Sequence, residues 1–320
     1  MRVLVTGGAG FIGSHAVDAL VARGDEVLVL DDLSTGSEEN LTGALADGAE
    51  LRVLDVADGE AFAAAAAAFA PASILHLAAQ ADVRVSVADP AFDARVNVLG
   101  TINALEAARA HPGCGLVLAA TGGAVYGEGD ERPLPFAESL SAEPLTPYGA
   151  SKLAAEGYVE TYGRLHGVPG ASLRFGNVYG PRQDPHGEAG VVAIFCGRLL
   201  DGVAPTVFGD GSQTRDYVYV GDTVAACLAA ADALASGWRV PGPVNVGTGV
   251  ETSVVDLLAV LGDVSGRGSA HELAPARTGE LHRVSIDPAL AERELGWRPE
   301  VDLATGLRTT FEHVSSQRGG

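Results

Sequence analysis

The first half of the chain alternates between short apolar runs and longer stretches in which apolar residues recur at helical spacing. A short apolar run is typical of a buried strand, and a period near 3.6 residues is typical of an amphipathic helix. The pattern predicts strands at residues 2–6, 26–30, 51–55, 74–77, 115–119 and 170–175. It predicts helices at residues 11–23, 60–70, 90–111 and 148–166. Strands that alternate with helices form a parallel sheet with helices on both faces, so we expect a doubly wound α/β fold.

This rhythm breaks after Asn177, where residues 180–190 are rich in Gly and Pro and predict a loop. The elements expected beyond it are a helix at 191–200, a strand at 216–220, a helix at 222–235 and short elements around the Gly- and Ser-rich stretch 262–269. We therefore expect a first domain and a smaller C-terminal α/β lobe. The first domain takes residues 1–176 and is completed by residues 214–240, and the lobe takes residues 177–213 and 241–320.

The composition is acidic, with 47% hydrophobic residues and a formal net charge of −20 over 320 residues. This charge argues against nucleic acid and anionic membranes as partners. No uncharged apolar run is long enough to span a bilayer, and the first residues predict a strand rather than a signal peptide. Cys114, Cys196 and Cys227 lie far apart without metal-type spacing. We expect reduced core thiols, no metal site and a cytoplasmic location.

The turn after the first predicted strand is rich in glycine. Gly8, Gly10 and Gly13 fit the pattern G-x-G-x-x-G, and Gly7 fits a looser version with Gly10 and Gly13. Because it lacks Cβ atoms, such a turn lets the backbone approach a pyrophosphate bound at the N-terminus of the following helix. Asp31 follows the second strand at about the offset of the acid that binds a ribose 2′-hydroxyl. Together these features predict a Rossmann-type dinucleotide-binding domain.

The acidic end of the second strand indicates which dinucleotide binds. Residues 31–40 contain no Lys or Arg, and Asp32 adds a negative charge beside Asp31. These carboxylates would repel the 2′-phosphate of NADP, whereas Asp31 would bind the 2′-hydroxyl of NAD. We therefore expect NAD as the cofactor.

Tyr148 and Lys152 carry the clearest catalytic signal in the sequence. They lie four residues apart on a predicted helix and therefore share a face. A phenol has a pKa of about 10 and is a poor base at neutral pH. An ammonium group nearby favours the phenolate, so we expect Lys152 to lower the pKa of Tyr148. The tyrosine could then exchange a proton with a carbinol during hydride transfer.

In combination with the dinucleotide fingerprint, these residues resemble the extended short-chain dehydrogenase/reductase family that acts on nucleotide sugars, and most of all its 4-epimerases. The resemblance runs nearly end to end and rests on residues 6–15, 31–34, 55–56, 76–80, 97, 125–127, 148–152, 174–182, 209–218, 245–247 and 295–297. It implies that a Rossmann-type sheet binds NAD and that the C-terminal lobe binds a UDP-sugar. The motifs are specific for the family and less specific for the substrate.

The resemblance also implies roles for residues at matching positions, with Tyr148 as acid/base, Lys152 beside it and Thr121 as the group that orients the substrate. The cofactor-binding residues implied are Gly7, Gly10, Phe11, Ile12, Gly13, Asp31, Asp32, Leu33, Ser34, Thr35, Asp55, Val56, Leu77, Ala78, Ala79, Gln80, Asn97, Ala119, Tyr148, Lys152, Phe175 and Val178. The substrate-binding residues implied are Thr121, Tyr148, Asn177, Val191, Val192, Thr206, Val207, Phe208, Gln213, Arg215, Arg277 and Glu280.

One position departs from the family pattern. A catalytic Ser or Thr commonly stands four residues before Tyr126, where this chain has Gly122. Thr121 is the only hydroxyl nearby, so we expect it to take that role, with the following glycines allowing the loop to shift by one residue. Otherwise Tyr148 transfers its proton without a side-chain partner there, or water substitutes.

The reaction implied is epimerisation at C4 of a UDP-hexose, such as UDP-glucose and UDP-galactose, through a transient 4-keto sugar. N-acetylated hexoses and uronates stay open as substrates, and Val284 falls close to the position that gates an acetamido group. Dehydratases and decarboxylases of this family carry acidic residues where this chain has Gly122 and Gly123, which argues against both. The intact Tyr148 and Lys152 argue against a non-catalytic NAD-binding protein.

Two further expectations concern histidines and assembly. His15, His76 and His282 have no accompanying acid or nucleophile pattern, so we expect them to be structural. The helices predicted at 90–111 and 148–166 would form a four-helix interface in proteins of this kind, which predicts a homodimer.

Overall fold

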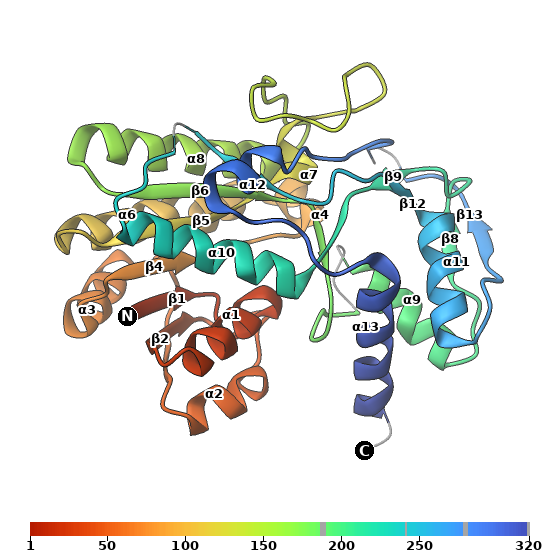
Figure 1. Cartoon of the computed structure of the whole chain (residues 1–320), viewed down its shortest axis with the longest axis horizontal. Coiled ribbons are helices and arrows are strands. Elements are labelled where there is room, and N and C mark those ends of the chain that lie inside the picture. The colour runs from red at the N-terminus through yellow and green to blue at the C-terminus, as the bar shows by residue number, and fades with distance from the viewer. Residues whose placement is uncertain (186–189, 241, 278–280, 319–320) are drawn as a thin grey trace.

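A seven-stranded parallel sheet lies at the centre of the first part of the molecule (Figure 1). The computed structural model describes residues 1–185, 190–240, 242–277 and 281–318. The strands are β1 (Arg2–Thr6), β2 (Glu26–Asp31), β3 (Glu50–Val53), β4 (Ser73–His76), β5 (Gly115–Thr121), β6 (Gly170–Phe175) and β11 (Val244–Val246). Their order is β3-β2-β1-β4-β5-β6-β11, and all neighbours are parallel. The order reverses between β1 and β4, so the predicted Rossmann-type fold is confirmed.

Helices cover both faces of the sheet because successive strand residues point to opposite faces. Val5 of β1 packs with residues of α1 and α10, whereas the neighbouring Leu4 packs with residues of α3, α6 and α8. The bounds are α1 (Phe11–Ala22), α10 (Val220–Ala235), α3 (Gly59–Phe69), α6 (Gly100–Ala110) and α8 (Pro147–His166). The short elements around them are η1 (Glu38–Leu41), α2 (Thr42–Ala46), α4 (Val83–Ala88), α5 (Pro90–Ala94), η2 (Arg95–Leu99), α7 (Gly122–Val125) and α12 (Ala289–Leu295).

A second group of elements lies at one end of the molecule, away from α3 (Figure 1). Its helices are α9 (Val191–Leu200), α11 (Val254–Ser265) and α13 (Leu303–Arg318). Its strands form three short pairs: β7 (Asn177–Tyr179) with β10 (Tyr217–Tyr219), β8 (Thr206–Phe208) with β13 (Glu272–Ala274), and β9 (Thr214–Arg215) with β12 (Thr252–Ser253). Phe195, Leu257 and Leu307 join the three helices in one apolar cluster. This second core supports the loops that face the carboxyl edge of the sheet.

The structure differs from the predicted elements in several places. β11 was not predicted, and although it falls within the residues expected to form the lobe, it pairs with β6 in the central sheet. The single helix expected at 90–111 is divided into α5, a π-helical turn at η2 and α6. The strand expected at 216–220 is β10, and α10 begins already at Val220. In the region expected to hold only short elements, α11 and α13 are regular helices. The remaining strands of the first half agree with the prediction to within a residue or two.

The three cysteines are buried and free, as expected. Among the helices of the described residues, none combines the length and the apolar character that crossing a membrane requires.

Candidate active site

The glycine turn between β1 and α1 has the shape that a dinucleotide requires. Gly7 has a left-handed backbone with φ of +67°, and a Cβ there would lie 2.6 Å from the Ala78 backbone nitrogen. A Cβ on Gly13 would overlap the Gly7 carbonyl oxygen. Only glycine therefore permits this close approach of backbone segments at both positions. The same lack of side chains leaves the start of α1 open to a pyrophosphate, so the residues present fit NAD.

Asp31 closes this turn at the end of β2. Its carboxylate accepts hydrogen bonds of 2.9 Å from the backbone N–H groups of Ala9 and Leu33. Burial raises the pKa of Asp31, and the two N–H donors work against that rise. The side chain of Asp32 is held by Ser34, whose backbone N–H and hydroxyl both donate to Oδ1. The predicted acidic end of β2 is thus in place beside the glycine turn, without a basic side chain in residues 31–40.

Asp55 and Val56, which are expected to bind the cofactor, follow directly after β3 and Leu54. The Asp55 carboxylate accepts from Ala57 N–H at 2.8 Å and pairs with Arg95 at 2.9 Å. Val56 is buried against Gly100, where an added Cβ would lie 2.9 Å from Val56 Cγ2. Arg95 could not be recognised as part of the site from the sequence, because its ion pair joins two segments that are 40 positions apart.

Gln80, Asn97 and Ser151 are joined by one buried hydrogen-bond network. Asn97 Oδ1 accepts from Gln80 N–H at 3.0 Å, and its amide donates to Gln80 O at 3.0 Å and to Ser151 Oγ at 3.1 Å. The amide also donates to Asp93 Oδ1 at 3.2 Å. Asn97 lies in the π-helical turn η2, and its side chain fixes the segment after β4. Asn97 therefore ties this segment to the residue that precedes Lys152 on α8.

Tyr148 and Lys152 lie on the first turns of α8, next to the end of β5. Lys152 is buried, and its Nζ donates to the Ala119 carbonyl oxygen at 3.0 Å. The Thr121 hydroxyl hydrogen-bonds the Tyr148 phenol. The structure thus brings together Tyr148, Lys152 and Thr121, the three residues expected to be catalytic, at the carboxyl edge of the sheet. Lys152 is also the only lysine in the sequence.

The expectation that Lys152 lowers the pKa of Tyr148 is wrong for this structure. Burial raises the pKa of Tyr148 to about 12, against a lowering by the hydrogen bond from Thr121. Burial also lowers the pKa of Lys152 to about 8, although the carboxylates of Asp93 and Glu156 work against it. Both shifts follow from moving a charged form out of water. The spacing of the pair was informative, but the sign of the shift depends on burial, which spacing does not report.

Steric crowding explains why position 122 is a glycine. A Cβ there would lie 2.8 Å from Ile286 Cδ1 and 2.9 Å from Ile286 Cγ2. Gly123 has more room, since its nearest neighbours would be Asn177 Oδ1 at 3.6 Å and Thr121 Oγ1 at 3.8 Å. Ile286 therefore occupies the space that a Ser or Thr at 122 would need. The hydroxyl of Thr121 stands one residue earlier and still reaches Tyr148.

The residues expected at the nucleotide sugar lie mostly on β8, β9 and the start of α9. The Arg277 guanidinium lies 4.0 Å from the centre of the Phe208 ring, and Gln213 Nε2 donates to the Phe208 carbonyl oxygen at 3.0 Å. Arg215 donates to the Thr214 carbonyl oxygen at 2.7 Å. The other expected residues with described positions are Asn177 on β7, Val191 and Val192 on α9, and Thr206 and Val207 on β8. Glu280 lies outside the described residues.

Two of these expected residues are packed away from a ligand. The side chains of Val192 and Val207 belong to the apolar cluster of α9, α11 and α13. Any contact of these two residues with a nucleotide sugar would come through their backbone atoms. The expectation that Val192 and Val207 bind the substrate therefore gains no support from the packing of their side chains.

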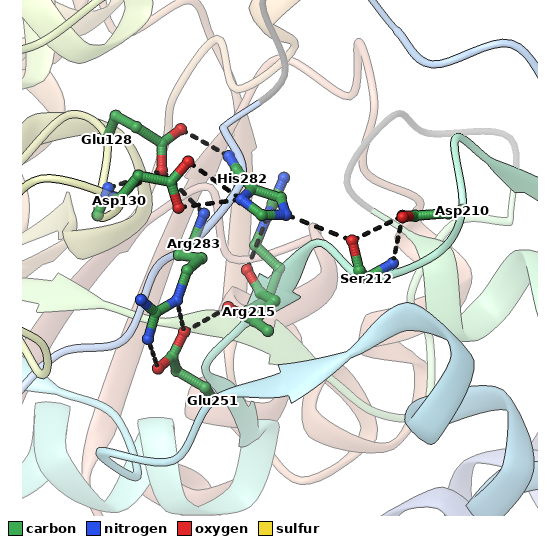
Figure 2. A network of polar contacts seen from close by, with 10 residues as sticks. Glu128, Asp130, Asp210, Ser212, Arg215, Glu251, His282 and Arg283 are labelled. Atoms are coloured by element: carbon green, nitrogen blue, oxygen red, sulfur yellow. Dashed lines mark hydrogen bonds and ion pairs between the residues drawn. The ribbon is translucent and has the colours of Figure 1, made fainter.

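A polar network that the sequence did not predict joins the segment after β5 to the segment before α12 (Figure 2). Glu128 accepts from the backbone N–H groups of His282 and Arg283 at 2.6 and 2.9 Å. His282 lies between Asp130, with Nδ1 2.9 Å from its carboxylate, and Ser212, with Nε2 3.3 Å from its hydroxyl. His282 thus has an acidic neighbour that no sequence pattern indicated, and these contacts are compatible with the structural role expected for it. The contacts join residues about 150 positions apart, so no local pattern announced them.

The lower part of the same network fastens β9 and β12. Arg283 forms a bidentate pair with Glu251, at 2.9 and 2.6 Å. Thr214 donates to the same carboxylate at 2.7 Å, and Figure 2 shows Arg215 close to this pair. The segment that carries Arg215 is thus fixed from two sides. In the part of the chain that the structure describes, no cluster of His, Cys, Asp and Glu could hold a metal ion.

His76 is fully buried at the end of β4, and the structure agrees with a structural role. Its Nδ1 lies 2.8 Å from Thr6 Oγ1, and its Nε2 has no partner among the described residues. Burial, with a smaller contribution from the charge of Lys152, lowers the pKa of His76 to about 3. The imidazole is therefore neutral at physiological pH.

A Rossmann-type sheet with a glycine turn, an acid at the end of β2 and a Tyr/Lys pair at the end of β5 defines an extended short-chain dehydrogenase/reductase. Residues 3–247 match the family described as the NAD dependent epimerase/dehydratase family. The UDP-glucose 4-epimerase of Mycolicibacterium smegmatis is 46% identical over 98% of this chain and 98% of its own length. This chain belongs to the NAD-dependent epimerase/dehydratase family.

Solved structures agree with this assignment. The UDP-glucose 4-epimerase of Thermotoga maritima, determined with UDP-glucose, is 40% identical with a TM-score of 0.93, covering 99% of this chain and 100% of that chain. The UDP-glucose 4-epimerase of Thermus thermophilus, determined in complex with NAD, is 46% identical with a TM-score of 0.88, covering 98% of this chain and 99% of that chain.

Proposed function

We propose that this chain is an NAD-dependent UDP-hexose 4-epimerase that interconverts UDP-glucose and UDP-galactose through a transient 4-keto sugar. The observation that carries the proposal is the meeting of Tyr148, Lys152 and Thr121 at the same edge of the sheet as the glycine turn. Epimerisation requires one group that takes a proton and returns it, and a dehydratase requires a further acid and base. Gly122 and Gly123 provide neither. The full-length similarity to two UDP-glucose 4-epimerases supports the same reaction.

In this reaction Tyr148 removes the proton of the 4-hydroxyl group and later returns it to the 4-keto oxygen. Bound NAD supplies the hydride acceptor for C4 and, in its oxidised form, a positive charge that favours the phenolate. Tyr148 depends on nearby positive charge because burial raises its pKa to about 12. Thr121 donates to or accepts from the phenol and orients the reacting hydroxyl group. Lys152, anchored on Ala119, contributes a charge that lies within the buried part of the site.

The nucleotide is the anchor of the substrate in this proposal. Phe208 offers an aromatic face for the base, and Arg215 and Arg277 supply guanidinium groups for the diphosphate. Such cations are valuable in a chain with a net charge of −20, because the background field repels an anionic ligand. The sugar must remain loosely held, since it has to present both faces of C4 to the cofactor.

N-acetylated hexoses find no support as the preferred substrate. Val284, expected near the gating position, is only 1% exposed and packs with Tyr126, Phe136 and Ile286. A small side chain at 284 therefore enlarges no open pocket in this structure.

We further propose that the enzyme is a homodimer and cytoplasmic. Phe92, Leu99, Tyr158 and Leu165 are large apolar side chains exposed on α5, η2 and α8, where the predicted interface lies. Three buried free thiols are compatible with a reducing compartment. Light scattering on the purified chain tests the assembly, and a mass of a single 32.5 kDa chain at micromolar concentration would contradict the dimer.

The reaction is tested on purified protein without added NAD. We expect UDP-galactose to be converted to UDP-glucose, and the Tyr148→Phe variant to retain bound NAD but lose turnover. UDP-N-acetylgalactosamine, UDP-glucuronate and dTDP-glucose are tested in parallel to rank the sugars. No turnover of any 4-epimer pair by NAD-loaded protein would remove the epimerase assignment. A keto-deoxy product would move it to a dehydratase, and consumption of external NAD would move it to a dehydrogenase.

A further inference from the structure

Asp93 is a buried carboxylate that no motif singled out. It lies on α5 and is 0% exposed. Its Oδ1 accepts from Gln80 Nε2 at 2.9 Å and from Asn97 Nδ2 at 3.2 Å. Its Oδ2 is also buried and has no hydrogen-bond partner among the described residues. An ionised group that is buried and only partly hydrogen-bonded is costly, so a nearby positive charge is expected to compensate it.

The hydrogen bonds of Asn97 connect Asp93 to the part of α8 that carries Lys152, a buried positive charge. Helix α5 packs on α8, which carries Lys152, and Asn97 connects Asp93 to Ser151, the neighbour of Lys152. The ammonium of Lys152 is 3% exposed and attracted electrostatically by Asp93. Its hydrogen bond to the Ala119 carbonyl satisfies one donor, but a carbonyl carries no charge.

The other titratable groups around Lys152 are accounted for. Glu156, on the same helix, also attracts the ammonium, but its two oxygens are bound by Arg174 at 2.9 and 2.6 Å. His76, from β4, is neutral because its pKa is lowered to about 3. Tyr148 remains protonated in this structure, since its pKa is raised to about 12. Asp93 is therefore the carboxylate near Lys152 that no arginine neutralises among the described residues.

We propose that Asp93 is a positioning residue that keeps the buried Lys152 ammonium charged while the enzyme works at neutral pH. The proposal rests on the proposed function, because a charged Lys152 is useful only where Tyr148 has to release a proton. Burial alone favours the neutral amine, and Asp93 opposes this from a fixed position held by Gln80 and Asn97. Without the carboxylate, Lys152 would lose its proton within the physiological range.

The single lysine makes a direct test available. Protein grown on lysine labelled with ¹³C at Cε gives one side-chain lysine resonance, and its pH dependence reports Lys152 alone. For the wild-type chain without NAD we expect a midpoint near pH 8, and the variants are compared with it in the same state. For Asp93→Asn, which keeps hydrogen-bonding capacity but removes the charge, we expect the midpoint to fall by about one pH unit or more. The alkaline limb of kcat should move down by a similar amount.

Asp89→Asn is the matched control. Asp89 caps the same helix α5 and accepts from Phe92 N–H at 2.9 Å, and asparagine caps a helix equally well. It removes one charge from α5 near the surface, so the lysine midpoint and the kcat profile should stay as in the wild type. Asp93→Glu, which retains the charge, should restore most of the alkaline activity lost in Asp93→Asn.

An Asp93→Asn protein that is folded, binds NAD and titrates Lys152 at the wild-type midpoint would overturn the proposal. Equal shifts in Asp89→Asn and Asp93→Asn would do so too, because they would indicate a general effect of net charge. If Asp93→Asn does not fold, Asp93→Ser, with a smaller uncharged side chain, carries the same expectation and the same refutation. The resonance needs no substrate, so failure of the UDP-sugar assay alone would count against the proposed function and leave the role of Asp93 standing.

Discussion

The two neighbouring glycines at positions 122 and 123 allow a sharp test of why the catalytic hydroxyl lies at Thr121. An added Cβ at 122 would lie 2.8 and 2.9 Å from two Ile286 carbons and 3.3 Å from the Phe175 carbonyl oxygen. Ordinary carbon–carbon contacts are about 3.5–4.0 Å, so the side chain of Ile286 would have to move by roughly 0.6–1.2 Å. Overpacking of this size costs about 1–3 kcal/mol, which we expect Gly122→Ala to lose in free energy of unfolding.

Gly123→Ala is the matched control, because its Cβ would meet only atoms at 3.6 and 3.8 Å. Neither glycine has a left-handed backbone, so alanine fits both conformations. We expect Gly123→Ala to be neutral or to gain about 0.4–1 kcal/mol through reduced entropy of the unfolded chain. Urea unfolding of both variants measures the difference, provided the slope with denaturant is unchanged.

Removal of Ile286 should reverse the effect at 122. Ile286→Ala alone is expected to cost about 2–5 kcal/mol, because it leaves a cavity in a buried cluster. In the double variant the new Cβ fills part of that cavity. We therefore expect the double variant to lose less free energy of unfolding than the two single variants lose together, by about 1 kcal/mol or more. Equal stability of Gly122→Ala and Gly123→Ala, or strict additivity with Ile286→Ala, would refute the steric explanation.

Three further predictions follow from the site. Tyr148→Phe should lower kcat by about 10²–10⁴ while NAD stays bound, and measured turnover within tenfold of the wild type would exclude Tyr148 as the acid/base. The pKa of His76 is about 3 in the folded protein and 6.5 in the unfolded chain. The neutral imidazole therefore contributes its full stability above pH 6.5, and this stability is lost as the pH falls toward 3. The loss is about 1.4 kcal/mol per pH unit, so unfolding at pH 5 should show about 2 kcal/mol less stability than at pH 7, and His76→Asn should flatten that slope. Arg277→Ala should raise KM for UDP-glucose more than it lowers kcat, and an effect on kcat alone would contradict a role in holding the diphosphate.

The first six strands of the sheet and the glycine turn could be predicted because each rests on a local pattern. Each of the strands β1, β2 and β4 is a continuous apolar run, and the glycines after Thr6 also stand close together. Such patterns can be recognised within a few residues of sequence. The π-helical turn at η2 could not be predicted, because Asn97 is held there by contacts with Gln80 and Ser151 rather than by its neighbours.

The candidate site likewise contains some residues that a local sequence pattern identifies and others that only the folded structure identifies. Tyr148 and Lys152 share a helix face, so four residues of sequence were enough to select them. Asp93 and Ile286 act through contacts with segments far from them in sequence, and a carboxylate or an aliphatic side chain alone is not a signal. The direction of the pKa shift at Tyr148 was missed for a related reason, since burial is a property of the packed molecule.

Few basic groups in this chain can change their charge near neutral pH, so the pH dependence of its activity is simple to interpret. All basic side chains other than Lys152 and the histidines are arginines, which keep their proton at any working pH. The pKa values of the three thiols are raised to about 12 by burial, so they stay protonated there as well. We therefore expect Lys152, with a pKa of about 8, to account for a loss of activity between about pH 7.5 and 9.5, together with any change in the proton held by Tyr148.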